Sequence, residues 1–249
     1  MTFIEIQAKI RNTQYLDFGR ILDQSINMFK EIWLKGFLMV LIIAACAFCL
    51  TILFSFIGMG PNTNEAEWDT GFNLYAFYSN NVWYALLQTI IMSSITIGLL
   101  AGFYRICKQV DVNRQESDDL FYFFKGGYIQ KIGMLGLIYA LIAAIAQSLY
   151  VIPYIYAFVP LSFFAIIFAN NTELTETEIV KLSFYIGTKK WLITFGLLFI
   201  TGILGMLGIL ACGVGILFTM SIVYIPVYFV YRDVIGFEDN DEIMKIGTE

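Results

Sequence analysis

The sequence predicts an all-α membrane protein: a polytopic bundle of six transmembrane helices with three short cytoplasmic amphipathic helices. The first observation is composition. Of 249 residues 59% are hydrophobic and 14% charged, whereas soluble domains carry about 25% charged residues. A single core of this size cannot hide so much apolar surface from water. The second observation is that long segments without Asp, Glu, Lys or Arg alternate with short polar segments.

Residues 1–35 are predicted to form an N-terminal cytoplasmic or interfacial amphipathic segment. Apolar residues recur at helical spacing from Phe18 to Trp33, and charged residues such as Arg20 and Lys30 occupy the other side. A helix of this kind either lies in the membrane interface or packs on the cytoplasmic face of the protein itself. Both interpretations stay open at the level of sequence.

Residues 36–232 form the predicted transmembrane domain. Its apolar segments have the length needed to cross about 30 Å of hydrocarbon, and Pro153 marks the turn between the third and fourth spans. The six predicted spans are residues 36–58, 82–104, 132–152, 153–169, 191–210 and 214–231. Residues 233–249 form an acidic cytoplasmic tail.

Two further amphipathic helices are expected in the polar segments between spans. Ser117 is a candidate N-cap for a short helix that ends at Gly126 and the glycine after it. Thr175 and Glu178 match the capping box that begins many helices, and the helix that follows is expected to end near Gly187. The three amphipathic segments, each followed by an apolar hairpin, form a faint threefold pattern. Duplication and a shared way of entering the membrane explain this pattern equally well.

The distribution of basic residues predicts the orientation in the membrane. The N-terminal segment has five Lys or Arg residues, residues 105–131 five, residues 170–190 three and the C-terminal end two, which accounts for all 15. The loops on the other side, residues 61–81, 150–154 and 211–215, have none. Because basic loops remain in the cytoplasm, both termini of this multi-pass protein are predicted to be cytoplasmic.

Three short motifs resemble a known group of proteins. They are Phe-Gly-Arg-Ile-Leu at 18–22, Asp-Leu-Phe at 119–121, and Pro-Val-Tyr-Phe-Val-Tyr-Arg-Asp at 226–233. With them, most of the chain resembles uncharacterised six-helix bacterial integral membrane proteins related to the membrane domain of glycerophosphodiester phosphodiesterases. The resemblance implies a location in the bacterial inner membrane. It does not imply the enzymatic activity, because the chain has no room for the phosphodiesterase barrel.

The residue types argue against catalysis and cofactors. The chain has no histidine, which removes the commonest general base and metal ligand. Cys46 and Cys49 have redox spacing, but thiols within hydrocarbon stay protonated, and no second pair completes a zinc site. The predicted spans contain no ionisable Asp, Glu, Lys or Arg for a proton relay. We therefore predict no catalytic residue, no metal and no cofactor, and we expect no nucleic-acid partner.

The favoured function is non-catalytic: organising membrane lipids or scaffolding a membrane partner, either another protein or a second copy of the chain. Each basic group near an anionic leaflet contributes about 1 kcal/mol of attraction. The alternative is that the basic residues only fix topology. The candidate contacts to anionic lipid are Arg105, Lys108, Arg114, Lys125, Lys131, Lys189 and Lys190.

A second hypothesis is an uncoupled transporter or channel for a small or lipidic substrate. The second and third spans carry uncharged polar residues, which either line a polar path or form hydrogen bonds between helices. These residues are Gln88, Ser93, Ser94, Thr96, Gln147 and Ser148. Gly98 and Gly102 allow close helix packing within the same span.

Overall fold

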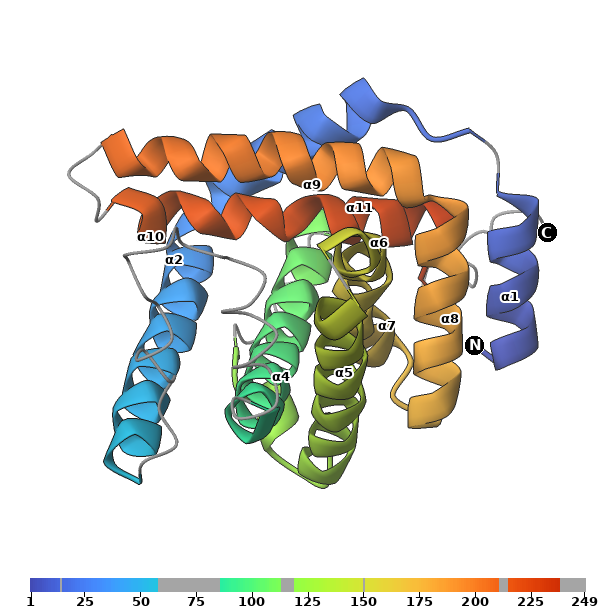
Figure 1. The fold of residues 1–249 in the computed structure, drawn as a ribbon. Helices are drawn as coiled ribbons and strands as arrows, with labels where there is room; N and C mark the ends of the chain where they lie inside the picture. Colours follow the sequence, from blue (N-terminus) through green and yellow to red (C-terminus); the bar gives the residue numbers. More distant parts are fainter. Residues whose placement is uncertain (14, 58–85, 113–118, 150, 211–214, 238–249) are drawn as a thin grey trace.

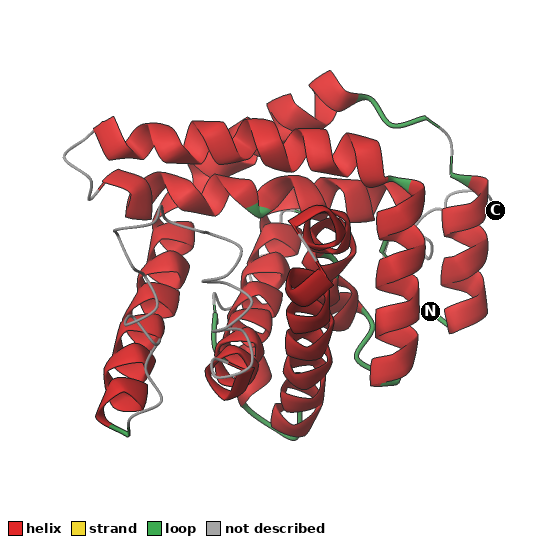
Figure 2. Ribbon diagram, in the orientation of Figure 1, coloured by secondary structure: helices red, strands yellow, loops and turns green. Residues whose placement is uncertain are grey.

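The computed structural model describes residues 1–13, 15–57, 86–112, 119–149, 151–210 and 215–237. This part of the chain is helical throughout, with short connections and no strand (Figures 1 and 2). Six of its helices are long and apolar enough to cross a membrane, which confirms the predicted fold class. They are Phe18–Phe56, Leu86–Asp111, Ile129–Leu149, Ile152–Asn170, Trp191–Leu210 and Gly215–Val234.

The N-terminal segment contains a helix that the sequence pattern had not separated. Helix α1 (Phe3–Asn12) begins with a capping box, in which the Thr2 hydroxyl accepts from the Glu5 N–H and the Glu5 carboxylate accepts from the Thr2 N–H. Ile6 and Ile10 on one side of α1 are fully buried. The helix packs against α8 (Glu176–Lys189), beside which it lies in Figure 1.

Helix α2 runs without a break from Phe18 to Phe56 and so continues across the predicted boundary between residues 35 and 36. Gly36 does not end the helix. A side chain there would collide with Ser221 of η4 (Met220–Val223), so the glycine allows two helices to approach closely. The 39 residues of α2 span about 58 Å, so part of the helix extends beyond a hydrocarbon layer of about 30 Å.

The second span also continues past its predicted end. Helix α4 (Leu86–Asp111) passes residue 104 and carries Arg105 and Lys108 in its last turns. Charged residues do not stop a helix as it leaves the membrane, since the backbone hydrogen bonds continue. The first residues of the predicted span, 82–85, lie outside the described residues.

Helices α4 and α5 (Ile129–Leu149) pack closely along each other. The contact centres on Gly136, where a side chain would collide with Ser94. The Ser93 hydroxyl donates to the Gly136 carbonyl at 2.8 Å. Small residues and a hydroxyl thus join the two helices, as expected for helices within a membrane.

The short helix predicted to end at Gly126 does not form within the described residues. Only a single 3-10 turn forms, η2 (Tyr122–Phe124), and Gly126 and Gly127 follow with left-handed φ angles of 64° and 76°. The turn packs against the glycines of α4: a Cβ on Gly98 would lie 2.5 Å from the Phe124 ring. Burial of these aromatic rings decides the local conformation, and the proposed cap at residue 117 lies outside the described chain.

The fourth span is bent at a proline. It consists of α6 (Val151–Ser162) and α7 (Phe164–Asn170), and the interruption follows Pro160, which has no N–H for the helix. The prediction that Pro153 marks the turn before this span is wrong. Pro153 lies in the first turn of α6, where a missing N–H costs nothing.

The capping box at Thr175 is confirmed, and it begins α8. This helix ends at Lys189, two residues after the predicted end near Gly187. Gly187 allows close packing, because a Cβ there would lie 2.5 Å from the Pro160 Cα. The last two spans lie side by side in Figure 1. They consist of α9 (Trp191–Met206), η3 (Leu207–Leu210), α10 (Gly215–Thr219), η4 and α11 (Ile225–Val234); the predicted hairpin at 211–214 is outside the described residues.

Long-range hydrogen bonds bring the basic segments together at one end of the molecule, which we call the polar end. The Lys131 amine donates to the carbonyl of Thr172 at 2.6 Å, which joins the start of α5 to the connection before α8. The Lys189 amine donates to the carbonyl of Ile10 at 2.8 Å, which joins α8 to the end of α1. These bonds join α8 and the connection before it to α1 and α5, which are far apart in sequence.

Candidate anion-binding site at the end of α4

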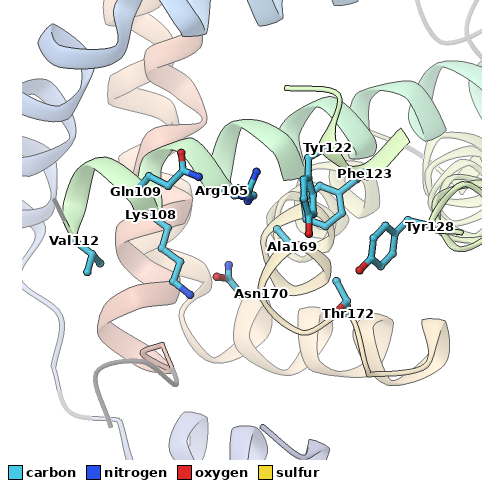
Figure 3. A pocket seen from close by; sticks show the side chains of 10 residues that line it. All are labelled: Arg105, Lys108, Gln109, Val112, Tyr122, Phe123, Tyr128, Ala169, Asn170 and Thr172. Carbon is cyan, nitrogen blue, oxygen red and sulfur yellow. The ribbon is translucent and has the colours of Figure 1, made fainter. Parts of the chain in front are cut away.

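A cavity of about 230 Å³, the α4 pocket, lies at the polar end. It is enclosed by the last turns of α4, the η2 turn and the connection between α7 and α8 (Figure 3). None of the described residues that line it is acidic. These residues are Arg105, Lys108, Gln109, Val112, Tyr122, Phe123, Tyr128, Ala169, Asn170 and Thr172.

The two cations of the pocket rest on aromatic rings. The Arg105 guanidinium carbon lies 4.0 Å from the centre of the Tyr122 ring, and the Lys108 amine lies 4.9 Å from the centre of the Phe237 ring. A ring attracts a cation through its quadrupole but carries no net charge. These contacts hold both side chains in position beside the pocket, and two cations close together favour an anionic ligand.

Neutral polar groups complete the lining. Figure 3 shows Asn170 facing Lys108 across the hollow, with the hydroxyl groups of Tyr128 and Thr172 further along the same wall. The Asn170 amide donates to the Ile166 carbonyl at 3.0 Å, which fixes its side chain at the end of α7. Amide and hydroxyl groups can donate hydrogen bonds to the oxygens of an anion.

The wall of the pocket is held from behind. The Lys131 amine donates to the backbone carbonyls of both Thr172 and Leu174. The Asn171 amide donates to the Tyr231 hydroxyl at 2.7 Å and to the Ile167 carbonyl. These bonds fix the connection between α7 and α8, so the pocket is already formed before any ligand arrives.

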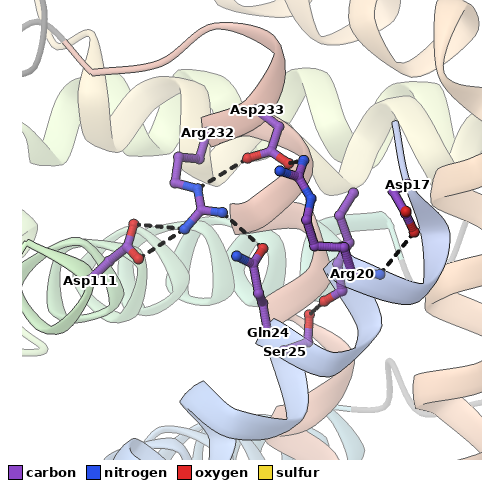
Figure 4. Close-up of polar contacts among 8 residues, drawn as sticks. Asp17, Arg20, Gln24, Ser25, Asp111, Arg232 and Asp233 are labelled. Atoms are coloured by element: carbon purple, nitrogen blue, oxygen red, sulfur yellow. Dashed lines mark hydrogen bonds and ion pairs between the residues drawn. The ribbon is translucent and has the colours of Figure 1, made fainter. Parts of the chain in front are cut away.

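A second charged group, the Arg232 cluster, includes Asp111 at the end of α4 (Figure 4). The guanidinium of Arg232 in α11 donates to the Asp111 carboxylate at 2.9 Å and to the Gln24 side-chain carbonyl at 2.9 Å. It also donates to Asp233 at 3.1 Å, and Asp233 in turn accepts from Arg20 at 2.6 Å. The cluster therefore joins α2, α4 and α11.

This cluster was not predicted from the sequence, although all of its residues are charged or polar. The Arg232 and Asp111 side chains are 20% and 21% exposed, and the Tyr228 hydroxyl adds a further hydrogen bond to Asp111 at 2.9 Å. The available signal was that opposite charges end two apolar helices on the same side. Nothing in the local pattern indicates which acid meets which base.

The seven predicted lipid-contact residues are not brought into one site. Of the six that the structure describes, two line the α4 pocket, Arg105 and Lys108. Lys125 pairs with Asp119 at 2.6 Å, a hydrogen bond that lowers the pKa of that carboxyl. Lys131 and Lys189 donate to backbone carbonyls, whereas Lys190 lines a separate groove. Arg114 lies outside the described residues.

The six residues of the predicted polar path do not line a single described cavity. Ser93 and Thr96 line an interior cavity of about 90 Å³, together with Tyr104 and Tyr139. The Ser93 hydroxyl also reaches α5, as described above. Most of the surface that lines this cavity is apolar.

The other polar-path residues have different surroundings. The Gln88 amide donates to the Thr51 hydroxyl of α2 at 3.0 Å. The hydroxyl groups of Ser94 and Ser148 each donate at 2.8 Å to the carbonyl four residues earlier in their own helix. Gln147 is half-buried on α5. The hydrogen bonds of Gln88 and Ser93 join helices, whereas those of Ser94 and Ser148 stay within one helix.

Within the described chain, no group of three or more His, Cys, Asp or Glu residues could hold a metal ion. Cys46, Cys49 and Cys107 are free thiols there. Comparison with family models, with curated proteins and with solved structures found no match. The resemblance to the membrane domain of glycerophosphodiester phosphodiesterases therefore stays a prediction, and function is argued from the site alone.

Proposed function

We propose that this multi-pass membrane protein is non-catalytic and organises lipids by binding an anionic, phosphate-bearing headgroup in the α4 pocket. The observation that carries the proposal is a preformed pocket with two cations held on aromatic rings and no acidic residue among its described lining. A guanidinium binds phosphate oxygens through two parallel hydrogen bonds, and an ammonium adds a point charge.

The position of the pocket supports a lipid ligand. Arg105 and Lys108 occupy the last turns of α4, a helix long and apolar enough to cross a membrane. The end of such a helix lies at the depth of the headgroups. The asymmetric distribution of Lys and Arg in the sequence favours the cytoplasmic leaflet of a bacterial inner membrane, where anionic lipids attract basic residues.

The test is a titration of the purified protein in neutral detergent. The ligands are short-chain phosphatidylglycerol, short-chain phosphatidylcholine and inorganic phosphate. We expect phosphatidylglycerol to bind most tightly. The double variant R105Q/K108Q should weaken that binding about 30-fold, since each cation contributes about 1 kcal/mol.

The matched control is K125Q, which removes a lysine that is 70% exposed and lies outside the pocket. Binding of phosphatidylglycerol by R105Q/K108Q at the strength of K125Q would refute the proposal. Inorganic phosphate binding as tightly as the lipid would identify a soluble anion as the ligand. Mass spectrometry of gently purified protein adds a third result: a stoichiometric protein partner would favour scaffolding.

The interior cavity keeps uncoupled transport as a second candidate, because Ser93 and Thr96 line it within the bundle. Cysteines placed at Thr96, Gln88 and Gln147 in a cysteine-free background test this function. A water-accessible path requires that these cysteines react with aqueous thiol reagents. If all three remain unreactive in the membrane, the transport hypothesis fails.

A further inference from the structure

A groove of about 390 Å³, the α2–α9 groove, lies between the start of α2 and the junction of α8 with α9. It is separate from the α4 pocket and shares no lining residue with it. One part of its lining is apolar and the other carries two amines. The lining residues are Tyr15, Leu16, Phe18, Lys189, Lys190, Leu192 and Ile193.

The apolar part belongs to the beginning of a membrane span. Leu192 is the second residue of the span Trp191–Leu210 and its side chain is 79% exposed. Phe18 packs against α9 at Gly196, where a Cβ would lie 3.2 Å from the phenylalanine ring. Exposed apolar groups at the end of a span meet lipid chains and not water.

The charged part consists of two adjacent lysines with different surroundings. The Lys189 amine donates to the carbonyls of Ile10 at 2.8 Å and Arg11 at 2.5 Å, at the C-terminal end of α1 where a cation is favourable. Lys190 is half-buried, and burial together with the neighbouring Lys189 lowers its pKa. A bound anion would offset both effects.

Aromatic residues indicate the level in the membrane at which the groove lies. Trp191 stacks between Tyr156 and Phe195, with ring centres 6.3 Å and 4.8 Å away. The Trp191 indole N–H donates to the Tyr156 carbonyl at 3.1 Å. Trp and Tyr gather at the boundary between membrane and water. The groove beside Trp191 therefore opens at headgroup depth.

We infer that the α2–α9 groove binds one anionic glycerophospholipid, with its phosphate beside Lys190 and an acyl chain over Leu192 and Ile193. The inference rests on the membrane placement made under the proposed function, but not on the α4 pocket. Because Lys189 holds the end of α1, the bound lipid lies where α1, α2, α8 and α9 meet. It would fasten the N-terminal helix to the bundle.

Native mass spectrometry of the full chain in neutral detergent tests this site. The protein is titrated with phosphatidylglycerol, with phosphatidylcholine and with inorganic phosphate. The wild type should retain phosphatidylglycerol at the groove. K190Q should weaken this binding about fivefold, the effect of one cation near an anion, and L192S should weaken it through the acyl chain. The matched control K181Q removes an exposed lysine of α8 outside the groove.

Each outcome decides the inference. Equal lipid retention by K190Q, L192S and K181Q would overturn it, and L192S is informative even if K190Q folds poorly, because Leu192 is largely exposed. Inorganic phosphate competing as well as the lipid would overturn the acyl-chain assignment. The variant R105Q/K108Q separates the two proposals. If it loses lipid but retains the K190Q-sensitive lipid, there are two sites. If it loses no lipid and K190Q still does, the groove is supported and the pocket is refuted.

Discussion

The Arg232 cluster and the α4 pocket use cations in opposite ways within one turn of the same helix. Asp111 of α4 accepts from Arg232, with both side chains about four-fifths covered. Lys108 lies three residues earlier and rests on the ring of Phe237. The first arrangement neutralises charge between three helices. The second holds cations against aromatic rings at the wall of a pocket.

This difference separates structural cations from cations that can bind. A partly buried ion pair with further hydrogen bonds fixes the helices that carry it, and loss of one partner leaves an uncompensated charge. A cation on an aromatic ring gains a modest attraction and keeps its net charge for a ligand. Lys125 and Lys131 are engaged by a carboxylate and by carbonyls and do not line the pocket, so they are weaker candidates than Arg105.

The largest expected effect comes from breaking the Arg232 cluster. R232Q leaves Asp111 without its cation and should destabilise the protein by about 2 kcal/mol, a value reduced for partial exposure. Thermal melting in detergent measures this change. The double variant D111N/R232Q should recover part of the loss. Unchanged melting of R232Q would show that the cluster does not hold the three helices together.

The second prediction concerns a variant that adds a carboxylate to the α4 pocket, where it can pair with Lys108. V112D places a carboxylate in the lining, one helical turn after Lys108. Nearby opposite charges near a protein surface attract by about 1–2 kcal/mol, so affinity for short-chain phosphatidylglycerol should fall about tenfold. V112N has the same shape without the charge and is the control. Equal affinities of the two variants would contradict the electrostatic account.

A smaller effect is expected from the ring that supports Arg105. Y122L removes the π face beneath the guanidinium, whereas Y122F keeps it. A partly exposed cation–π contact contributes about 0.5–1 kcal/mol, so Y122L should weaken lipid binding about threefold. The same titration measures both variants. If Y122F weakens binding as much as Y122L, the hydroxyl and not the ring face is responsible.

The smallest expected effect concerns Glu178, whose carboxylate caps the start of α8 and lies outside the α4 pocket. The Thr175 backbone N–H donates to Glu178 at 2.9 Å and, with the Thr175 hydroxyl, lowers the pKa of Glu178 below its ordinary 4.5. Because the folded-state pKa is the lower one, this stabilisation is present at neutral pH. It is lost as pH falls through the folded pKa. E178Q should melt slightly below the wild type near neutral pH, and the gap should close in acid.

The site was predictable only in part. Arg105 and Lys108 stood out because basic residues follow an apolar span. Tyr122, Tyr128 and Asn170 did not, because their local sequence has no feature that distinguishes a pocket wall from a membrane-interface residue. The short helix expected before Gly126 was wrong for a related reason. The Phe123 ring is buried and the Phe124 ring packs at Gly98 of α4, and the local sequence does not indicate either contact.

The sequence by itself determined the all-α class, six spans and the capping box at Thr175, because apolar length and capping depend on neighbours within a few residues. Only the tertiary structure showed that α2 continues through Gly36, where the lack of a side chain leaves room for Ser221. It also decided that Arg232 meets Asp111, 121 positions away in the chain. Such contacts form only when distant helices pack together, and no local pattern encodes which charges will then face each other.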